Sequence, residues 1–91
     1  MKVIWTDYLK FRVKQRGFDL SKIEDVVRYS SEIYYDTVTG RRIVVGRYNN
    51  DLIMIPYDVD EGEDSITPVT VHVTTRQQIN FRIRTGRFKN E

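Results

Sequence analysis

The sequence predicts a single α+β domain, in which two N-terminal helices pack on a roughly four-stranded antiparallel meander sheet and a C-terminal helix follows. Two observations predict this class. Apolar residues recur at helical spacing over residues 6–29, whereas strand-forming residues broken by turn residues dominate residues 32–75. A chain of 91 residues has room for only one small core. We therefore expect one domain over residues 1–91.

Capping residues predict where the two N-terminal helices begin and end. The first helix is expected over residues 6–16, since Thr6 can cap its start and Gly17 suits the left-handed conformation that ends a helix. The stretch Ser21-Lys22-Ile23-Glu24 has the spacing of a capping box, a serine followed three residues later by a glutamate. The second helix is therefore expected over residues 21–29.

Strand-forming residues separated by turns predict an antiparallel meander. Four strands are expected, over residues 32–38, 41–48, 52–58 and 67–75. Asn49 begins a tight connection between the second and third, because asparagine tolerates a positive φ. Ile43-Val44-Val45 and Leu52 to Ile55 are apolar at every position. These central strands are expected to be covered on both sides, or covered on one side by a partner.

The last strand alternates and then changes period. Val69, Val71 and Val73 should form its buried face, and Thr70, His72 and Thr74 its polar face. From Thr75 the pattern becomes helical, with Ile79 and Ile83 on one side. The only histidine of the chain should thus lie on the polar face of a strand that leads into a basic helix.

Charge is distributed unevenly along the chain. Residues 1–20 carry five Lys or Arg against two acids, residues 51–66 carry six acids and no base, and residues 67–91 carry five bases and one acid. Basic ends of this kind can form a positive face that favours phosphate backbones. The alternative interpretation is a solvated surface of mixed charge.

The sequence excludes or disfavours several kinds of binding site and cellular location. The chain has no cysteine, which excludes disulfides and thiolate metal sites. The acidic loop Asp58–Ser65 does not match a calcium-binding EF-hand, because its glycine falls at position five of the loop and its twelfth residue is Val69. No apolar run is long enough to span a membrane and no signal-peptide pattern appears, so a cytoplasmic protein is expected. The chain has one histidine and no cluster of carboxylates beside it, so no metal or cofactor is expected.

The available side chains suffice for one kind of catalysis, the cleavage of RNA. Attack of a ribose 2′-hydroxyl on its own phosphate needs a proton acceptor, a proton donor and positive charge beside the phosphorane. His72, followed by Arg76 and Arg82 on the final helix, offers such a set. The alternative is that His72 is an ordinary surface residue of a strand.

The first helix offers a second set of candidate residues. Tyr8, Arg12 and Arg16 are each four residues apart and share one flank of that helix. Guanidinium groups beside a phenol could assist it in proton transfer. The alternative is an amphipathic helix whose tyrosine packs and whose arginines are solvated.

The same residues carry a resemblance to a known group of proteins. Residues Tyr8 to Phe18 resemble a first helix of the form H-x-x-x-R-x-x-x-R-G-[IVF], and Leu20 to Val26 resemble the short helix that follows it. Gly40 to Gly46 resembles a G-R-x-x-V-V-G segment of the strand pair, and Val71 to Arg82 a strand that runs into an arginine-rich helix. Over residues 6–75 the chain is thus similar to the RelE/BrnT-like toxin superfamily.

The resemblance implies the RelE/barnase-like fold and a toxin of a bacterial toxin–antitoxin pair that cleaves RNA. It implies RNA as substrate and a cognate antitoxin protein as partner. The chain departs from the pattern at Tyr8, where those proteins have histidine, whereas Arg12, Arg16 and Gly17 match. If that histidine is catalytic, the site of this chain is altered, since a phenol is a weaker base than an imidazole.

The residues therefore predict a metal-independent endoribonuclease with two groups of site residues. We expect catalysis by His72, Tyr8, Arg12 and Arg82, and RNA binding by Arg16, Arg76 and Arg87. Two alternatives remain open: a non-catalytic RNA-binding or adaptor domain of the same fold, and a protein-interaction domain that forms a homodimer through its apolar sheet.

Overall fold

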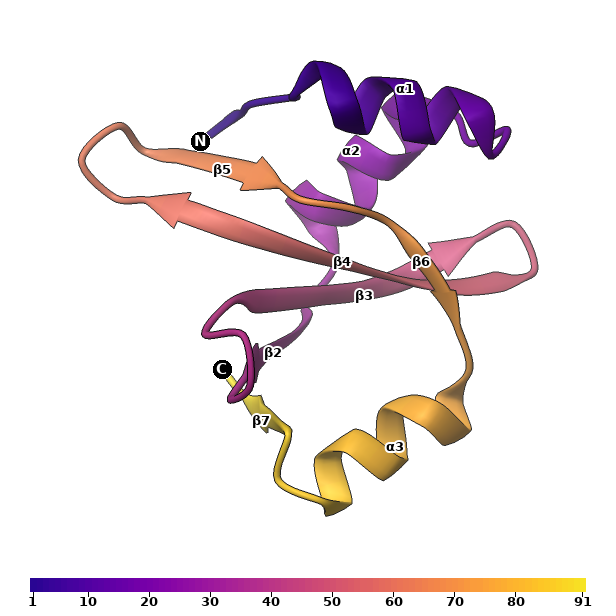
Figure 1. The fold of residues 1–91 in the computed structure, drawn as a ribbon, viewed down its shortest axis with the longest axis vertical. Helices are drawn as coiled ribbons and strands as arrows, with labels where there is room; N and C mark the ends of the chain where they lie inside the picture. Colours follow the sequence, from indigo (N-terminus) through magenta and orange to yellow (C-terminus); the bar gives the residue numbers. More distant parts are fainter.

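The computed structural model describes residues 1–91 as one sheet with helices on both of its faces (Figure 1). The helices are α1 Asp7–Gln15, α2 Leu20–Tyr29 and α3 Arg76–Arg84. The strands are β1 Lys2–Val3, β2 Glu32–Asp36, β3 Arg42–Tyr48, β4 Asp51–Asp60, β5 Ser65–Pro68, β6 His72–Thr74 and β7 Phe88–Asn90. Helices α1 and α2 cover one face and α3 covers the other. The expected α+β class is confirmed.

The sheet is larger than the four strands expected from the sequence. Its order is β1-β5-β4-β3-β2-β7, and β6 pairs with β4 beside β5. Every pair is antiparallel except β1 with β5, which is parallel. Two strands lie outside the four expected ones, β1 and β7, and they are only two and three residues long. They form because the backbone of each pairs with a neighbouring strand distant in sequence, a signal that local composition does not carry.

The single strand expected over residues 67–75 is instead two strands joined by a bulge. Tyr57 of β4 lies opposite Pro68, and Met54 lies opposite His72. Two residues of β4 therefore face three residues of the opposing chain, which is the definition of a β-bulge. Pro68 has no N–H to donate, so regular pairing ends there. The long strand β4 thus changes its partner from β5 to β6 halfway along.

The bulge determines which side chains face α1 and α2. Ile66 lies on that face, and unbroken alternation would place Thr70 and His72 there as well. The extra residue instead puts Val71 there, 3% exposed, and turns His72 towards α3. The expectation of one buried valine face is therefore right for Val71 and wrong for Val73, which is 55% exposed because β6 is an edge strand.

The core lies on both faces of the central strands, as their continuous apolar sequence predicts. Val44 belongs to the larger cluster of side chains, which β3 and β4 share with α1 and α2. Its neighbours Ile43 and Val45 point the other way and pack around Ile79 of α3. The chain's own helices therefore cover both sides of these two strands.

The two N-terminal helices begin at caps, but only one cap is the expected residue. Thr6 accepts a hydrogen bond from the backbone of the first turn of α1, as predicted. The capping box predicted at Ser21 is wrong, because Asp19 is the cap of α2 and accepts from the Ser21 backbone N–H at 3.0 Å. The carboxylate of Glu24 instead accepts a hydrogen bond of 3.1 Å from the indole N–H of Trp5, which is distant in sequence.

Gly46 of β3 is expected to be irreplaceable for packing. A methyl group added there would lie 2.6 Å from Cγ1 of Val26, a stiff side chain of α2. Gly46→Ala should therefore lower the free energy of unfolding by about 1–3 kcal/mol. Urea denaturation would measure this, with Gly62→Ala as the control, since its added methyl meets only an Asp60 oxygen at 3.4 Å. Equal effects of the two substitutions would contradict this description of the packing between α2 and the sheet.

Candidate functional site

The free edge of β6 is the place where side chains from opposite faces of the sheet meet. β6 pairs with β4 on one side, and no strand pairs with its other side. In Figure 1, β6 runs from the side of the sheet that α1 covers down to the start of α3. Long side chains of α1 and α3 can therefore approach this edge from opposite faces of the sheet.

Two arginines of α1 reach this edge from one face. Arg12 and Arg16 lie one helical turn apart. The Nη1 of Arg16 donates a hydrogen bond of 2.6 Å to the backbone carbonyl of Val71, the residue before β6. The Nε of Arg12 is buried and has no hydrogen-bond partner in the protein. A buried guanidinium donor without a partner is costly unless a ligand satisfies it.

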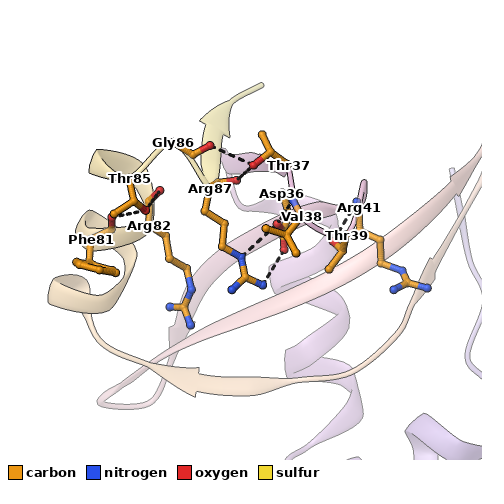
Figure 2. Close-up of polar contacts among 10 residues, drawn as sticks. All are labelled: Asp36, Thr37, Val38, Thr39, Arg41, Phe81, Arg82, Thr85, Gly86 and Arg87. Atoms are coloured by element: carbon orange, nitrogen blue, oxygen red, sulfur yellow. Dashed lines mark hydrogen bonds and ion pairs between the residues drawn. The ribbon is translucent and has the colours of Figure 1, made fainter.

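Arg82 of α3 approaches from the opposite face. Its guanidinium lies 5.6 Å from the centre of the Phe88 ring. In Figure 2 its side chain extends from α3 with no polar partner drawn at the guanidinium. None of the ion pairs in the structure involves Arg82, Arg12 or Arg16. The charges of these three arginines are therefore not neutralised by a carboxylate.

His72 lies among these charges and is partly buried. Its pKa is lowered from the ordinary value of 6.5, first by burial and then by the positive charges of Arg16, Arg82 and Arg12. The imidazole is consequently neutral at pH 7 and able to accept a proton. We refer to His72 with these three arginines as the arginine–histidine cluster.

Tyr8 lies on the same flank of α1 as the cluster's two arginines, one turn before Arg12. Its side chain is 62% exposed, so it belongs to the surface and not to the core. The structure therefore places four of the seven predicted site residues in the arginine–histidine cluster and a fifth, Tyr8, beside it.

Arg76 and Arg87, the other two predicted site residues, are engaged elsewhere. Arg76 forms a two-point ion pair with Glu32, in which Nη2 donates to Oε1 at 2.9 Å. Arg87 forms a second two-point pair with Asp36, both distances being 3.3 Å (Figure 2). Both pairs fasten the α3–β7 segment to β2. We infer that their first role is structural, which the sequence could not indicate because their partners lie 44 and 51 residues away.

The pair of Asp36 and Arg87 holds a carboxylate that is only 3% exposed. Burial by itself would raise the pKa of Asp36, but the hydrogen bonds from Arg87 and from the Val38 backbone N–H lower it further than burial raises it. The carboxylate is therefore ionised at neutral pH and acts as the anchor of β7.

The structure shows no arrangement of side chains for a metal site and no membrane-spanning helix. No group of three or more His, Asp or Glu side chains is arranged to hold a metal ion. None of the helices is long and apolar enough to cross a membrane. The acidic residues of the β4–β5 connection remain exposed and are spread along a hairpin.

Comparison with known proteins finds no relative. No family model matches the chain, no curated protein matches it, and no solved structure matches it.

The cluster predicts an unusual titration of His72. NMR should give a titration midpoint of His72 below about 6.5. Arg16→Gln should raise this midpoint, because Arg16 has the largest effect of the three neighbouring charges on the pKa of His72. Since folding lowers this pKa, the neutral imidazole contributes stability above pH 6.5 that is lost as the pH falls through the folded value. Arg41→Gln, which removes an arginine paired with Asp58, is the matched control. A midpoint at or above 6.5 in the wild type would contradict the described surroundings of His72.

Proposed function

We propose that this protein is a metal-independent endoribonuclease that binds RNA at the arginine–histidine cluster. One observation carries the proposal: three arginines without carboxylate partners, from helices on opposite faces of the sheet, lie near enough to a single neutral imidazole for their charges to lower its pKa. An imidazole beside concentrated positive charge is what cleavage of a phosphodiester by its own 2′-hydroxyl requires.

The arginines are suited to phosphate in particular. A guanidinium presents a planar set of donors that matches phosphate oxygens, and its charge is permanent. Arg12 has a buried Nε that lacks a partner, and Arg82 has no acidic partner. A phosphodiester bound here would supply an acceptor for the guanidinium of Arg82. The same positive charge opposes a divalent metal ion, which supports chemistry by the side chains alone.

The proposed reaction uses two proton-transfer groups. The neutral imidazole of His72 takes the proton of the 2′-hydroxyl, and the 2′-oxygen attacks the adjacent phosphorus. The guanidiniums of Arg12 and Arg82 stabilise the charge of the phosphorane. The bond from phosphorus to the 5′-oxygen then breaks, and the phenol of Tyr8 gives its proton to that oxygen. The products are a 2′,3′-cyclic phosphate and a 5′-hydroxyl, after which solvent returns the proton from His72 to Tyr8.

The proposed cellular role is that of a toxin held in check by a cognate antitoxin. The resemblance to RelE/BrnT-like proteins suggests this role, and two of its motif residues, Arg12 and Arg16, belong to the cluster. An antitoxin would act by covering the edge of β6 or by competing for its positive charge. The proposal places such a pair in the cytoplasm.

A second candidate function is RNA binding without cleavage. The observation that favours it is Tyr8, an exposed phenol at the position where the resembling proteins have histidine. Three arginines would hold phosphate equally well if no proton were transferred. The two candidates differ in whether removal of His72 abolishes product formation or leaves the protein's behaviour unchanged.

Removal of either proton-transfer group should slow cleavage. His72→Ala and Tyr8→Phe are each expected to lower the rate on a long single-stranded RNA by about 10²–10⁴-fold. Tyr29→Phe is the matched control, since it removes the hydroxyl of an exposed tyrosine on α2. Added EDTA should leave the wild-type rate unchanged.

The outcomes separate the candidates. Full activity in both His72→Ala and Tyr8→Phe would refute the assigned roles, and activity abolished by EDTA would refute the metal-free mechanism. Wild-type activity near background, together with activity gained in Tyr8→His, would establish the binding domain with a lost catalytic histidine.

Phosphate binding predicts a strong dependence on salt. The double variant Arg12→Gln/Arg82→Gln should weaken RNA binding and flatten the slope of log K against log salt by about 1.4 to 2 units, for two lost phosphate contacts. Arg41→Gln/Arg42→Gln removes the same charge from two arginines that are already paired with acids, and should change the slope much less. An equal change in the two double variants would mean that net charge alone, and not the cluster, governs binding.

A further inference from the structure

The surface of α3 carries a hollow that shares only Arg82 with the proposed cleavage chemistry. The hollow has a volume of about 300 Å³ and is lined by Gln77, Gln78, Phe81, Arg82 and Arg84. The ring of Phe81 is 57% exposed, whereas Ile79, two residues earlier, is fully buried in the core. Phe81 therefore contributes little to folding and presents an aromatic surface between amides and guanidiniums.

One amide of the hollow is held in a fixed orientation. The hydroxyl of Thr74, a buried residue of β6, donates a hydrogen bond of 2.9 Å to Oε1 of Gln78. Since the carbonyl end of this amide is engaged, its NH₂ group is the end left to bind a ligand. The hollow thus combines an exposed aromatic ring with an oriented hydrogen-bond donor.

Arg82 links the hollow to the arginine–histidine cluster. It lines the hollow, and its charge is also among those that lower the pKa of His72. A ligand with a flat ring on Phe81 and a phosphate on Arg82 would have that phosphate beside the imidazole. A nucleotide carries both parts, a flat base and a phosphate.

We infer that the hollow is a binding site for one unstacked nucleobase of single-stranded RNA. The base stacks on Phe81, a base carbonyl accepts a hydrogen bond from Gln78, and the attached phosphate lies on Arg82. This inference rests on the proposed function and names its substrate as single-stranded, because the bases of a duplex are already stacked and cannot cover an aromatic side chain.

The lining favours a base over an apolar protein segment. Phe81 is the only hydrophobic residue among the five that line the hollow, and two of the others are arginines. A protein segment that docks through its apolar side chains would leave these guanidiniums without acceptors. A nucleotide supplies an aromatic face and acceptor oxygens together.

The test compares oligonucleotides that differ only in their bases. The probes are a short 2′-O-methyl oligoribonucleotide, which cannot undergo attack by a 2′-hydroxyl, and the same strand with abasic positions. Phe81→Ala should weaken binding of the intact strand by about 5- to 150-fold, the range found for one stacked base, and hardly affect the abasic strand. The variant Phe81→Tyr should bind the intact strand about as well as the wild type, because it keeps the aromatic ring.

Tyr29→Ala is the matched control, since Tyr29 is an even more exposed aromatic residue outside the hollow. It should leave both affinities unchanged. The base site would be overturned if Phe81→Ala affected the intact and abasic strands equally, or affected neither. It would also be overturned if the wild type bound a duplex as tightly as the single strand. Each of these outcomes would leave phosphate binding intact. Failure of the wild type to bind any strand in a salt-dependent manner would overturn the proposed function as well.

Discussion

The pairing of β4 with two successive partners is the constraint on which the rest of the structure depends. Its first half pairs with β6 and its second half with β5, and the bulge between them absorbs one residue. This single residue reverses the alternation, so that Val71 enters the core under α1 and α2 while His72 turns towards α3. Without it, every side chain of β6 would change face. The fold and the position of the histidine are therefore set by the same irregularity.

Helices on opposite faces of the sheet explain how positive charges gather at one edge. Arg16 of α1 is hydrogen-bonded to Val71 beside β6, and Arg82 of α3 is near enough for its charge to lower the pKa of His72. Like charges so close together weaken folding, and an unsatisfied Arg12 Nε adds to this cost. Most arginines elsewhere in the chain, Arg76 and Arg87 among them, are paired with carboxylates, although Arg47 and Arg84 are not. Proteins concentrate such unfavourable arrangements at functional sites, and this contrast supports the proposed role of the cluster.

Local patterns were good guides wherever the determining contacts are local. The cap at Thr6, the left-handed Gly17 and the positive φ of Asn49 follow from the chemistry of a few neighbouring residues, and all three are found. The capping box at Ser21 failed because Asp19 competes for the same backbone N–H and the indole of Trp5 draws Glu24 away. The last strand failed at the bulge, since a pattern of alternating residues does not reveal where its partner strand skips one.

The order of elements, the two-sided core and the residue types available for chemistry follow from the sequence, because periodicity and composition are properties of neighbours along the chain. The sequence also singled out seven candidate site residues: Tyr8, Arg12, Arg16, His72, Arg76, Arg82 and Arg87. Whether these residues meet depends on pairings between distant segments. The contact of Arg16 with Val71 spans 55 residues, and the ion pair that occupies Arg87 spans 51. The tertiary structure alone decides which arginines have carboxylate partners and which lie near the histidine without one. The pairing of strands in the sheet, and not the order of residues, brings these side chains close together.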